Sequence, residues 1–129
     1  MSRFTLLVTT APYDDQGPST ALRFAQSVIK SDHQLAGVFF YAQGVGTANQ
    51  LLLPPSDESN LHQQWSEFSR QHNVPLQVCV TAGNRRGVVS HTEAQEAGLE
   101  QYNLALPFDQ VGLGELMQLL ADSDRVVQF

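Results

Sequence analysis

Cys79 is the only thiol in the sequence, and two cations, Arg85 and Arg86, follow it closely. Nearby cations favour the thiolate, the form in which a cysteine is a nucleophile. The residues directly after the thiol are mostly small, so segment 81–87 is expected to form a loop. The pattern indicates a reactive cysteine with Arg85 and Arg86 as candidates for stabilising its thiolate. The alternatives are a small buried hydrophobe at position 79 and surface or subunit-contact arginines.

The same residues match a second pattern, because five residues separate Cys79 from Arg85. In anion-binding loops of phosphatases and arsenate reductases, main-chain N–H groups and an arginine at this spacing hold an oxyanion. Such loops continue with a serine or threonine, whereas this sequence continues with Arg86 and Gly87. An anion-binding loop therefore stays open as an alternative.

The remaining polar residues give no pattern of metal ligands. The four histidines have no ligand spacing, and no second cysteine is present to complete a zinc site. His91 is a candidate local base or an ordinary surface histidine. The negative charges of Asp14 and Asp15 would repel a phosphate group in the first loop, which argues against nucleotide binding. We expect no metal and no organic cofactor.

Charge and composition narrow the class of protein further. Seven Lys and Arg against thirteen Asp and Glu give a net charge of −6, which repels a phosphate backbone and argues against direct nucleic-acid binding. No apolar run is long enough for a signal peptide or a membrane span. A lone cysteine forms no internal disulfide, so we expect a cytoplasmic protein with a free thiol.

The elements that must position these residues can be predicted from hydrophobic patterning. Four short apolar runs predict buried strands, at 4–9, 35–41, 76–80 and 125–129. Val88 and Val89 predict a brief extended piece between the last two. The third run places Cys79 near the carboxyl end of its strand, where open parallel sheets form their ligand crevices.

Helical spacing of apolar residues predicts the segments between the strands. The stripe over 21–29 predicts a first crossover helix that Ser19 or Thr20 caps. Further helices are expected around Leu61, Trp65 and Phe68, over 92–97, and around Leu113, Leu116, Met117 and Leu120. The alternation predicts an α/β fold, namely a single domain over 1–129 with a mainly parallel open sheet, helices on both faces and a flavodoxin-like strand order.

Several short motifs together resemble the TusD/DsrE family of sulfurtransferase subunits over nearly the whole chain. They are Val38-Phe39-Phe40-Tyr41, Gly44-Val45, Ala48-Asn49, Trp65, Val78-Cys79-Val80, Arg85-Arg86-Gly87, Gly112-Leu113-Gly114 and Ser123-Asp124-Arg125-Val126-Val127. The resemblance implies a DsrE-like three-layer fold. It also implies that Cys79 is the sulfur-accepting cysteine, which agrees with the choice made from the residues alone.

For function, the resemblance implies a sulfur relay in which Cys79 accepts sulfur as a persulfide. The donor would be a TusA-like carrier and the acceptor a TusE-like carrier, toward 2-thiouridine at the tRNA wobble position. TusB- and TusC-like subunits would complete a hetero-oligomer, for which segment 39–41 with its loop is expected to supply apolar contact surface. The alternatives are a DsrE-type relay subunit of sulfur oxidation and a non-catalytic assembly subunit.

Overall fold

Five parallel strands form the central sheet of the computed structural model, which describes residues 1–129. In chain order the strands are β1 (Arg3–Val8), β2 (Gln34–Phe40), β3 (Leu76–Cys79), β4 (Phe108–Val111) and β5 (Arg125–Gln128). Across the sheet they lie in the order β4-β3-β2-β1-β5. β3 therefore has a neighbour on each side, and β4 and β5 are the edges.

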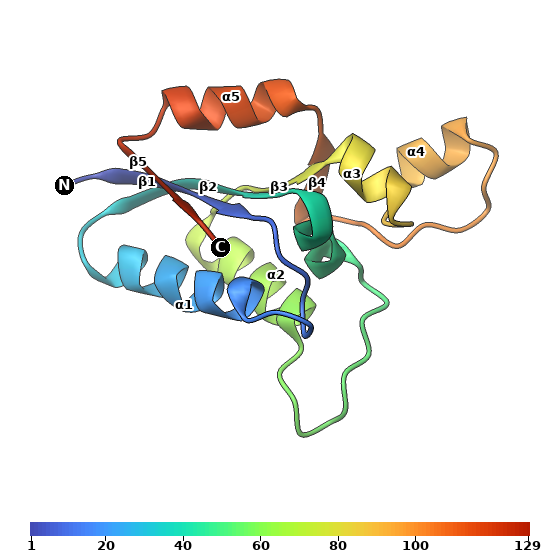
Figure 1. The fold of residues 1–129 in the computed structure, drawn as a ribbon, viewed down its shortest axis with the longest axis horizontal. Coiled ribbons are helices and arrows are strands. Elements are labelled where there is room, and N and C mark those ends of the chain that lie inside the picture. The colour runs from blue at the N-terminus through green and yellow to red at the C-terminus, as the bar shows by residue number, and fades with distance from the viewer.

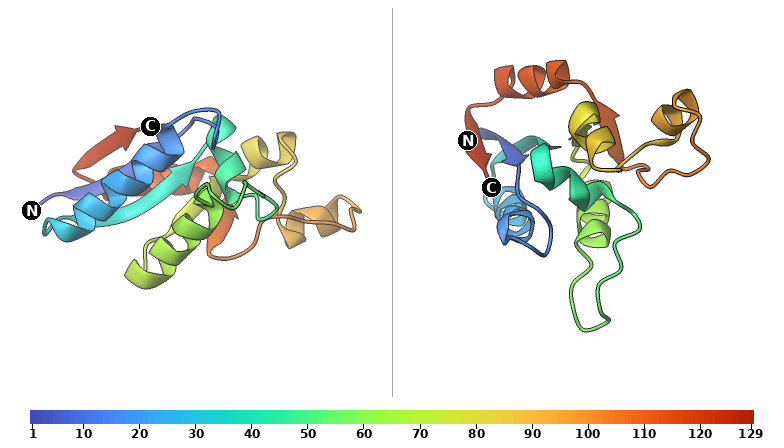
Figure 2. Two further views of the ribbon diagram at one scale, coloured as in Figure 1. Left: turned by 90° about the horizontal axis from the view of Figure 1, so that it is seen from below. Right: turned by 45° about the vertical axis from the view of Figure 1, so that its right-hand side comes forward.

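Helices cover both faces of the sheet, as predicted. Helices α1 (Gly17–Lys30) and α2 (Leu61–His72) lie on one face, and α5 (Leu113–Ala121) lies on the other (Figure 1). Figure 2 shows α1 and α2 side by side beneath the strands. Of three shorter helices, η1 (Ala42–Ala48) follows the carboxyl end of β2, α3 (Val80–Arg85) follows that of β3, and α4 (His91–Glu96) comes after α3. The three-layer α/β class is thus confirmed.

The strand order differs from the flavodoxin-like order 2-1-3-4-5 that we expected. Here the first four strands are added in one direction, and only the last connection returns across the sheet to place β5 beside β1. A right-handed crossover that runs in the opposite direction puts its helix on the opposite face, which explains why α5 lies alone there. Hydrophobic patterning identifies a buried strand but does not encode the direction of each crossover.

The sheet is stabilised by strands that are buried on both faces. In β2 every residue from Ala36 to Phe40 is buried, as expected for an inner strand of a parallel sheet. Trp65 of α2 is fully buried and meets the Phe40 ring edge-on at 5.4 Å. Phe39 and Phe40 are buried as well, so segment 39–41 itself offers only Tyr41, 37% exposed, as contact surface. The loop that follows it exposes Leu51 and Leu53, so the apolar surface expected of this segment and its loop is confined to Tyr41 and the loop.

Most predicted boundaries lie within one or two residues of the observed ones, but the start of α1 does not. The helix begins at Gly17, with Pro18 in its first turn, and Ser19 and Thr20 already lie inside it. Its N-cap residue, Gln16, forms no capping hydrogen bond through its side chain. Proline is favoured in the first turn because its φ is already helical and its missing N–H has no partner there, and this preference outweighs the serine and threonine cap signal.

Between β3 and β4 the structure differs from the prediction. Segment 81–87 is mostly helix α3 and not a loop, and Val88 and Val89 belong to no named strand, although Ser90 beside them forms an isolated bridge with Leu104. Strand β4 itself was missed, since only Phe108 among its four residues is fully buried and the strand shows no alternation. These elements surround Cys79, so their real arrangement decides what the site can do.

Candidate functional site

Cys79 lies at the point where β3 ends and α3 begins. Its Cα pairs with Val111 of β4, and the preceding residue Val78 pairs with Phe40 of β2. Cys79 has extended backbone angles and is the N-cap residue of α3. Cys79 therefore lies at the carboxyl edge of the sheet, as predicted, at the end of β3 between its neighbours β2 and β4; Figure 1 shows the end of β3 where α3 begins.

The Cys79 side chain is almost fully covered, with 2% of its surface exposed. It belongs to the main hydrophobic cluster together with Ala82 of α3 and Val88, which comes three residues after the end of α3. Ala82 comes three residues after Cys79, which places it on the next turn of α3 on the same side. In this conformation the thiol is sheltered from bulk water.

The two arginines lie at the far end of α3 from Cys79. Arg85 is the last residue of the helix and forms no side-chain hydrogen bond, and Arg86 is the C-cap residue. The Arg86 guanidinium donates a 3.1 Å hydrogen bond to the Ala82 carbonyl, which directs it back along the helix. Neither arginine forms a hydrogen bond with Cys79, so any effect on the thiolate in this conformation acts through space.

The helical conformation of residues 80–85 is unlike an anion-binding loop. The backbone N–H groups of Arg86 and Val88 both bond the Gly83 carbonyl, at 3.0 and 2.9 Å, and the N–H of Gly87 bonds the Asn84 carbonyl. These bonds close the C-terminal end of α3, and residues 80–85, which would form the anion-binding loop, are helical instead.

The side-chain amide of Gln110 holds in place segment 80–90, which consists of α3 and the residues up to Ser90 and is called the turn after Cys79 below. Sequence reasoning missed this contact. Its Nε2 donates to the Val80 carbonyl at 3.4 Å, to Asn84 Oδ1 at 3.2 Å and to the Val88 carbonyl at 3.1 Å. Its Oε1 accepts the N–H of Ser90 at 3.1 Å. One side chain of β4 thus contacts both ends of the turn. No local sequence signal marks it, because the contacts span 20 to 30 residues.

A second amide, Asn103, joins the same turn to the segment after η1. Its Oδ1 accepts the N–H of Val89 at 2.8 Å, and its Nδ2 donates to the Gly87 carbonyl and to Asn49 Oδ1. The Asn103 carbonyl in turn accepts the N–H of Gln50 at 2.8 Å. The irregular segments at the carboxyl edge are therefore cross-linked by side-chain amides together with backbone bonds, among them those from the N–H groups of Asn103 and Leu104 to the Val89 carbonyl.

Comparison with known proteins identifies the family. The family model described as "DsrE/DsrF-like family" matches residues 2–129. Relatives include "Sulfurtransferase TusD homolog" of Vibrio vulnificus (strain YJ016), 46% identical over 127 residues, and "Sulfurtransferase TusD" of Proteus mirabilis (strain HI4320), 46% identical over 126 residues. Each alignment covers 98% of this chain and 97% of the relative. The chain belongs to the DsrE/DsrF-like family.

The DsrE/DsrF-like fold is also found in a solved structure. The crystal structure of the ychN protein from E. coli superposes with a TM-score of 0.78, at 23% identity and with 100% of both chains covered. At this identity the likeness supports the fold alone. None of the helices in the present chain is long and apolar enough to cross a membrane.

Beside α3, the DsrE/DsrF-like chain has a cavity of about 350 Å³ that Arg86 lines. Asp14 from the loop after β1 and Asn49 from the end of η1 line the same cavity. Arg86 and Asp14, which the sequence singled out for different reasons, are thus brought to one place.

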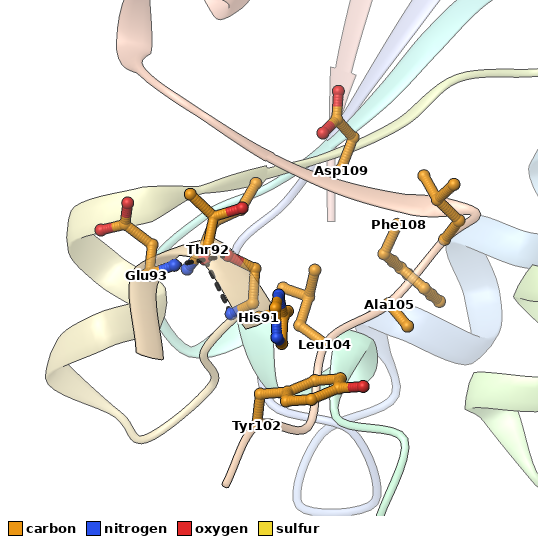
Figure 3. Close-up of a pocket in the computed structure, with 11 residues that line it drawn as sticks. His91, Thr92, Glu93, Tyr102, Leu104, Ala105, Phe108 and Asp109 are labelled. Carbon is orange, nitrogen blue, oxygen red and sulfur yellow. Dashed lines mark hydrogen bonds between the residues drawn. The ribbon is translucent and has the colours of Figure 1, made fainter. Parts of the chain in front are cut away.

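A larger cavity, of about 600 Å³, lies on the outer side of the Gln110 amide. His91, the first residue of α4, packs its ring edge-on against Tyr102 at 5.0 Å (Figure 3). In the same view the Asp109 carboxylate points away from both rings. His91 therefore has an aromatic neighbour, and no hydrogen bond links it to Cys79 as a base would require.

The pKa of His62 of α2 lies below its ordinary value. Its ring stacks on Phe108 of β4 at 5.0 Å, and Nδ1 lies 3.0 Å from the Thr47 carbonyl, so Nδ1 carries the proton and donates it. Burial lowers the pKa of His62, the bond to Thr47 offsets part of this change, and the charge of Arg70 adds to the lowering. Neutral His62 therefore fits the fold better than its cation does.

The pKa of His62 predicts how stability depends on pH. The unfolded chain takes up this proton near the ordinary value of about 6.5, before the folded chain does, so the free energy of unfolding falls as pH falls through that value. In His62→Asn, which keeps a donor near Thr47 but does not titrate, the loss between about pH 7.5 and 5.5 should be smaller. Thermal unfolding across this range checks the prediction. Equal pH slopes in both proteins would contradict it.

Proposed function

We propose that this chain is a sulfur-relay protein that carries sulfur as a persulfide on Cys79. The observation that carries the proposal is the position of its only thiol, at the carboxyl edge of an open parallel sheet and between two neighbouring strands. The TusD relatives at 46% identity, which are named sulfurtransferases, support the same activity. Cys79 is then the nucleophile, and Arg85 and Arg86 are its candidate stabilising cations.

The relay consists of two thiol exchanges. In the first, the Cys79 thiolate attacks the outer sulfur of a carrier persulfide, the S–S bond of the carrier breaks, and the carrier leaves as a thiolate. In the second, the thiolate of the next carrier attacks the outer sulfur now on Cys79, and the Cys79 thiolate leaves. The outer sulfur moves with no net oxidation or reduction, so the chemistry requires no metal or organic cofactor.

The carriers and the destination follow from the family resemblance. We propose a TusA-like donor, a TusE-like acceptor and 2-thiouridine formation at the tRNA wobble position, with TusB- and TusC-like chains as the other subunits of a cytoplasmic hetero-oligomer. The net charge of −6 supports an indirect role, in which sulfur reaches the tRNA through protein carriers. A DsrE-type role in sulfur oxidation would use the same two exchanges with different carriers.

Burial of the thiol sets a condition on the relay. With 2% of Cys79 exposed, a carrier thiol cannot reach it unless the covering turn moves. The same cover would shield a persulfide from small reducing thiols between the two exchanges. Transfer is therefore expected to be coupled to carrier docking, which opens the turn.

The proposal is tested by measuring the intact mass of the protein after incubation with a persulfide-loaded carrier or a cysteine desulfurase system. One added sulfur atom per chain is expected, and treatment with a reducing thiol should remove it. No mass gain with any donor, alone or with the TusB- and TusC-like chains present, would contradict the relay.

A non-catalytic assembly subunit is the second candidate, and the burial of Cys79 favours it. In that case the thiol is a structural hydrophobe. The two candidates differ in the native protein: a relay cysteine reacts slowly with an alkylating reagent through local opening, whereas a structural cysteine reacts only on global unfolding. The rate of alkylation as a function of denaturant distinguishes them.

The arginines give a further prediction. If the charge at the end of α3 favours the thiolate and the persulfide anion through space, Arg86→Ala should slow sulfur uptake about two- to tenfold, as expected for one cation acting across several ångströms. Arg85→Ala should slow sulfur uptake as well. Lys30→Ala removes an exposed cation from the far end of α1 and serves as the control. If all three variants take up sulfur at the parent rate, the arginines belong to the surface or to a subunit contact.

A further inference from the structure

Gln110 is placed where one side chain contacts both ends of the turn after Cys79. It belongs to β4, and its Cα pairs with Val78, one residue before Cys79 in the neighbouring strand. From there its amide reaches the residue directly after the thiol, Val80, and the returning chain at Val88 and Ser90. Further contacts in the turn are the bond from the N–H of Val88 to the Gly83 carbonyl and the bonds of the Asn103 amide to Gly87 and Val89.

The orientation of this amide follows from its partners. Three oxygen atoms surround Nε2 and one N–H faces Oε1, so the reversed amide would place an oxygen against three acceptors. Gly83 makes the close approach possible, because a Cβ at this position would lie 2.7 Å from Nε2 of Gln110 and 2.8 Å from the Val88 carbonyl. The amide and the glycine therefore form one close-packed contact inside the turn.

Hydrogen bonds also connect the partners of Gln110 to α4. Asn84 accepts from Gln110 and donates to Glu93 Oε1 at 2.9 Å. Ser90, whose N–H bonds Gln110, is the N-cap of α4 and accepts the N–H of Glu93 through its hydroxyl. The turn is thus tied to β4 on one side and to the start of α4 on the other, both through residues that bond Gln110.

We propose that Gln110 is a positioning residue for Cys79, whose amide holds segment 80–90 closed over the thiol and sets how often the thiol becomes accessible. The role of Gln110 in sulfur transfer rests on the proposed function, whereas its effect on the accessibility of Cys79 can be measured without any sulfur carrier. Ala82 and Val88, which lie in the closed segment, belong to the same buried cluster as Cys79. Loss of the amide leaves the carbonyls of Val80 and Val88 without this donor, and they regain a partner when the segment opens to water.

The test uses two replacements of nearly the same shape. Gln110→Glu keeps the acceptor for the Ser90 N–H and replaces the donor with a charged oxygen, and Gln110→Met removes both functions. Gln26→Glu makes the same chemical change on the exposed face of α1, where the side chain forms no hydrogen bond, and is the matched control. The measurement is the rate at which a small alkylating reagent modifies Cys79 in the native protein, followed by intact mass, since the chain has no other thiol.

Alkylation is expected to be roughly tenfold faster in Gln110→Glu and Gln110→Met, because two or more hydrogen bonds that close the segment are lost. The rate should depend only weakly on low concentrations of denaturant, which is the signature of local opening. A variant that is merely less stable would react through global unfolding, with the full denaturant dependence. Gln26→Glu should match the parent. Parent-like alkylation in both Gln110 variants, or acceleration that follows global unfolding alone, would overturn the inference.

Asn84→Ala provides a milder variant if those at Gln110 fail to fold. It removes one exposed acceptor of the Gln110 amide and leaves the carbonyl contacts, so a smaller increase, about two- to threefold, is expected with the same weak denaturant dependence. A rate equal to that of the parent would count against the inference. When sulfur uptake occurs, Gln110→Glu should change its maximal rate and leave the half-saturating carrier concentration near that of the parent. Failure of sulfur uptake in the parent would contradict the relay and leave the alkylation result to decide the role of Gln110.

Discussion

Replacement of Cys79 by serine is expected to abolish sulfur uptake completely while the protein stays folded. The hydroxyl is a far weaker nucleophile at neutral pH than a thiolate, and no second thiol is present to take its place. Because Cys79 is buried, an unpaired hydroxyl there costs about 1–3 kcal/mol of unfolding free energy, which a domain of this size tolerates. The intact mass after incubation with a persulfide donor should show no added sulfur.

Cys79→Ala is the matched variant for this experiment. It removes the thiol without burying a new polar group, so its loss of sulfur uptake cannot be attributed to a strained hydroxyl. Far-UV circular dichroism should be the same for the parent and both variants. A sulfur-dependent mass increase that persists in Cys79→Ser and Cys79→Ala would show that sulfur is held elsewhere and would end the relay proposal.

Trp65→Ala is expected to destabilise the fold more than any of the other replacements. The indole is fully buried, donates to the Pro18 carbonyl at 3.2 Å and meets the rings of Phe40 and Phe68 edge-on. It thereby joins α2 to the start of α1 and to β2. Truncation leaves a large cavity and removes the indole N–H bond to α1, for a loss of about 3–5 kcal/mol. Denaturant unfolding followed by circular dichroism measures this loss, since the variant lacks the only tryptophan.

Two controls separate the parts of this effect. Trp65→Phe keeps an aromatic ring and loses mainly the N–H bond to Pro18, so its cost should be clearly smaller than that of Trp65→Ala. Leu53→Ala truncates a side chain that is 93% exposed and should change the unfolding free energy by about 0.5 kcal/mol or less. A Trp65→Ala protein as stable as Leu53→Ala would mean that α2 does not pack against the sheet in this way.

The sequence predicts the inner part of the fold well because burial leaves a pattern in it. β1, β2 and β3 are apolar runs of the kind that a sheet covered on both faces requires, and α2 shows Leu61, Trp65 and Phe68 at helical spacing. The carboxyl-end position of Cys79 follows from its place in β3. These predictions depend only on which residues are buried.

What the sequence does not predict depends on contacts between distant residues. β4 is an edge strand with one fully buried side chain, and α3 contains Gly83, a poor helix former, and has no helical stripe of apolar residues. The amide contacts of Gln110 and Asn103 form only after β4 and the segment before it are in place. The surroundings of Cys79 are therefore made of the least predictable part of the chain.

The pairing of β5 with β1 also sets the order in which the molecule can be completed. Phe4 pairs with Arg125, and the N–H of Phe129 bonds the Leu7 carbonyl, so one side of β1 is covered only by the final strand. Contacts between such distant parts of a chain carry a large loop-closure entropy and slow folding. During synthesis the backbone N–H and C=O groups on this side of β1 stay unpaired until residues 125–128 have left the ribosome. Chains cut short before them would keep that edge free for pairing with other chains, so premature termination is expected to yield aggregates.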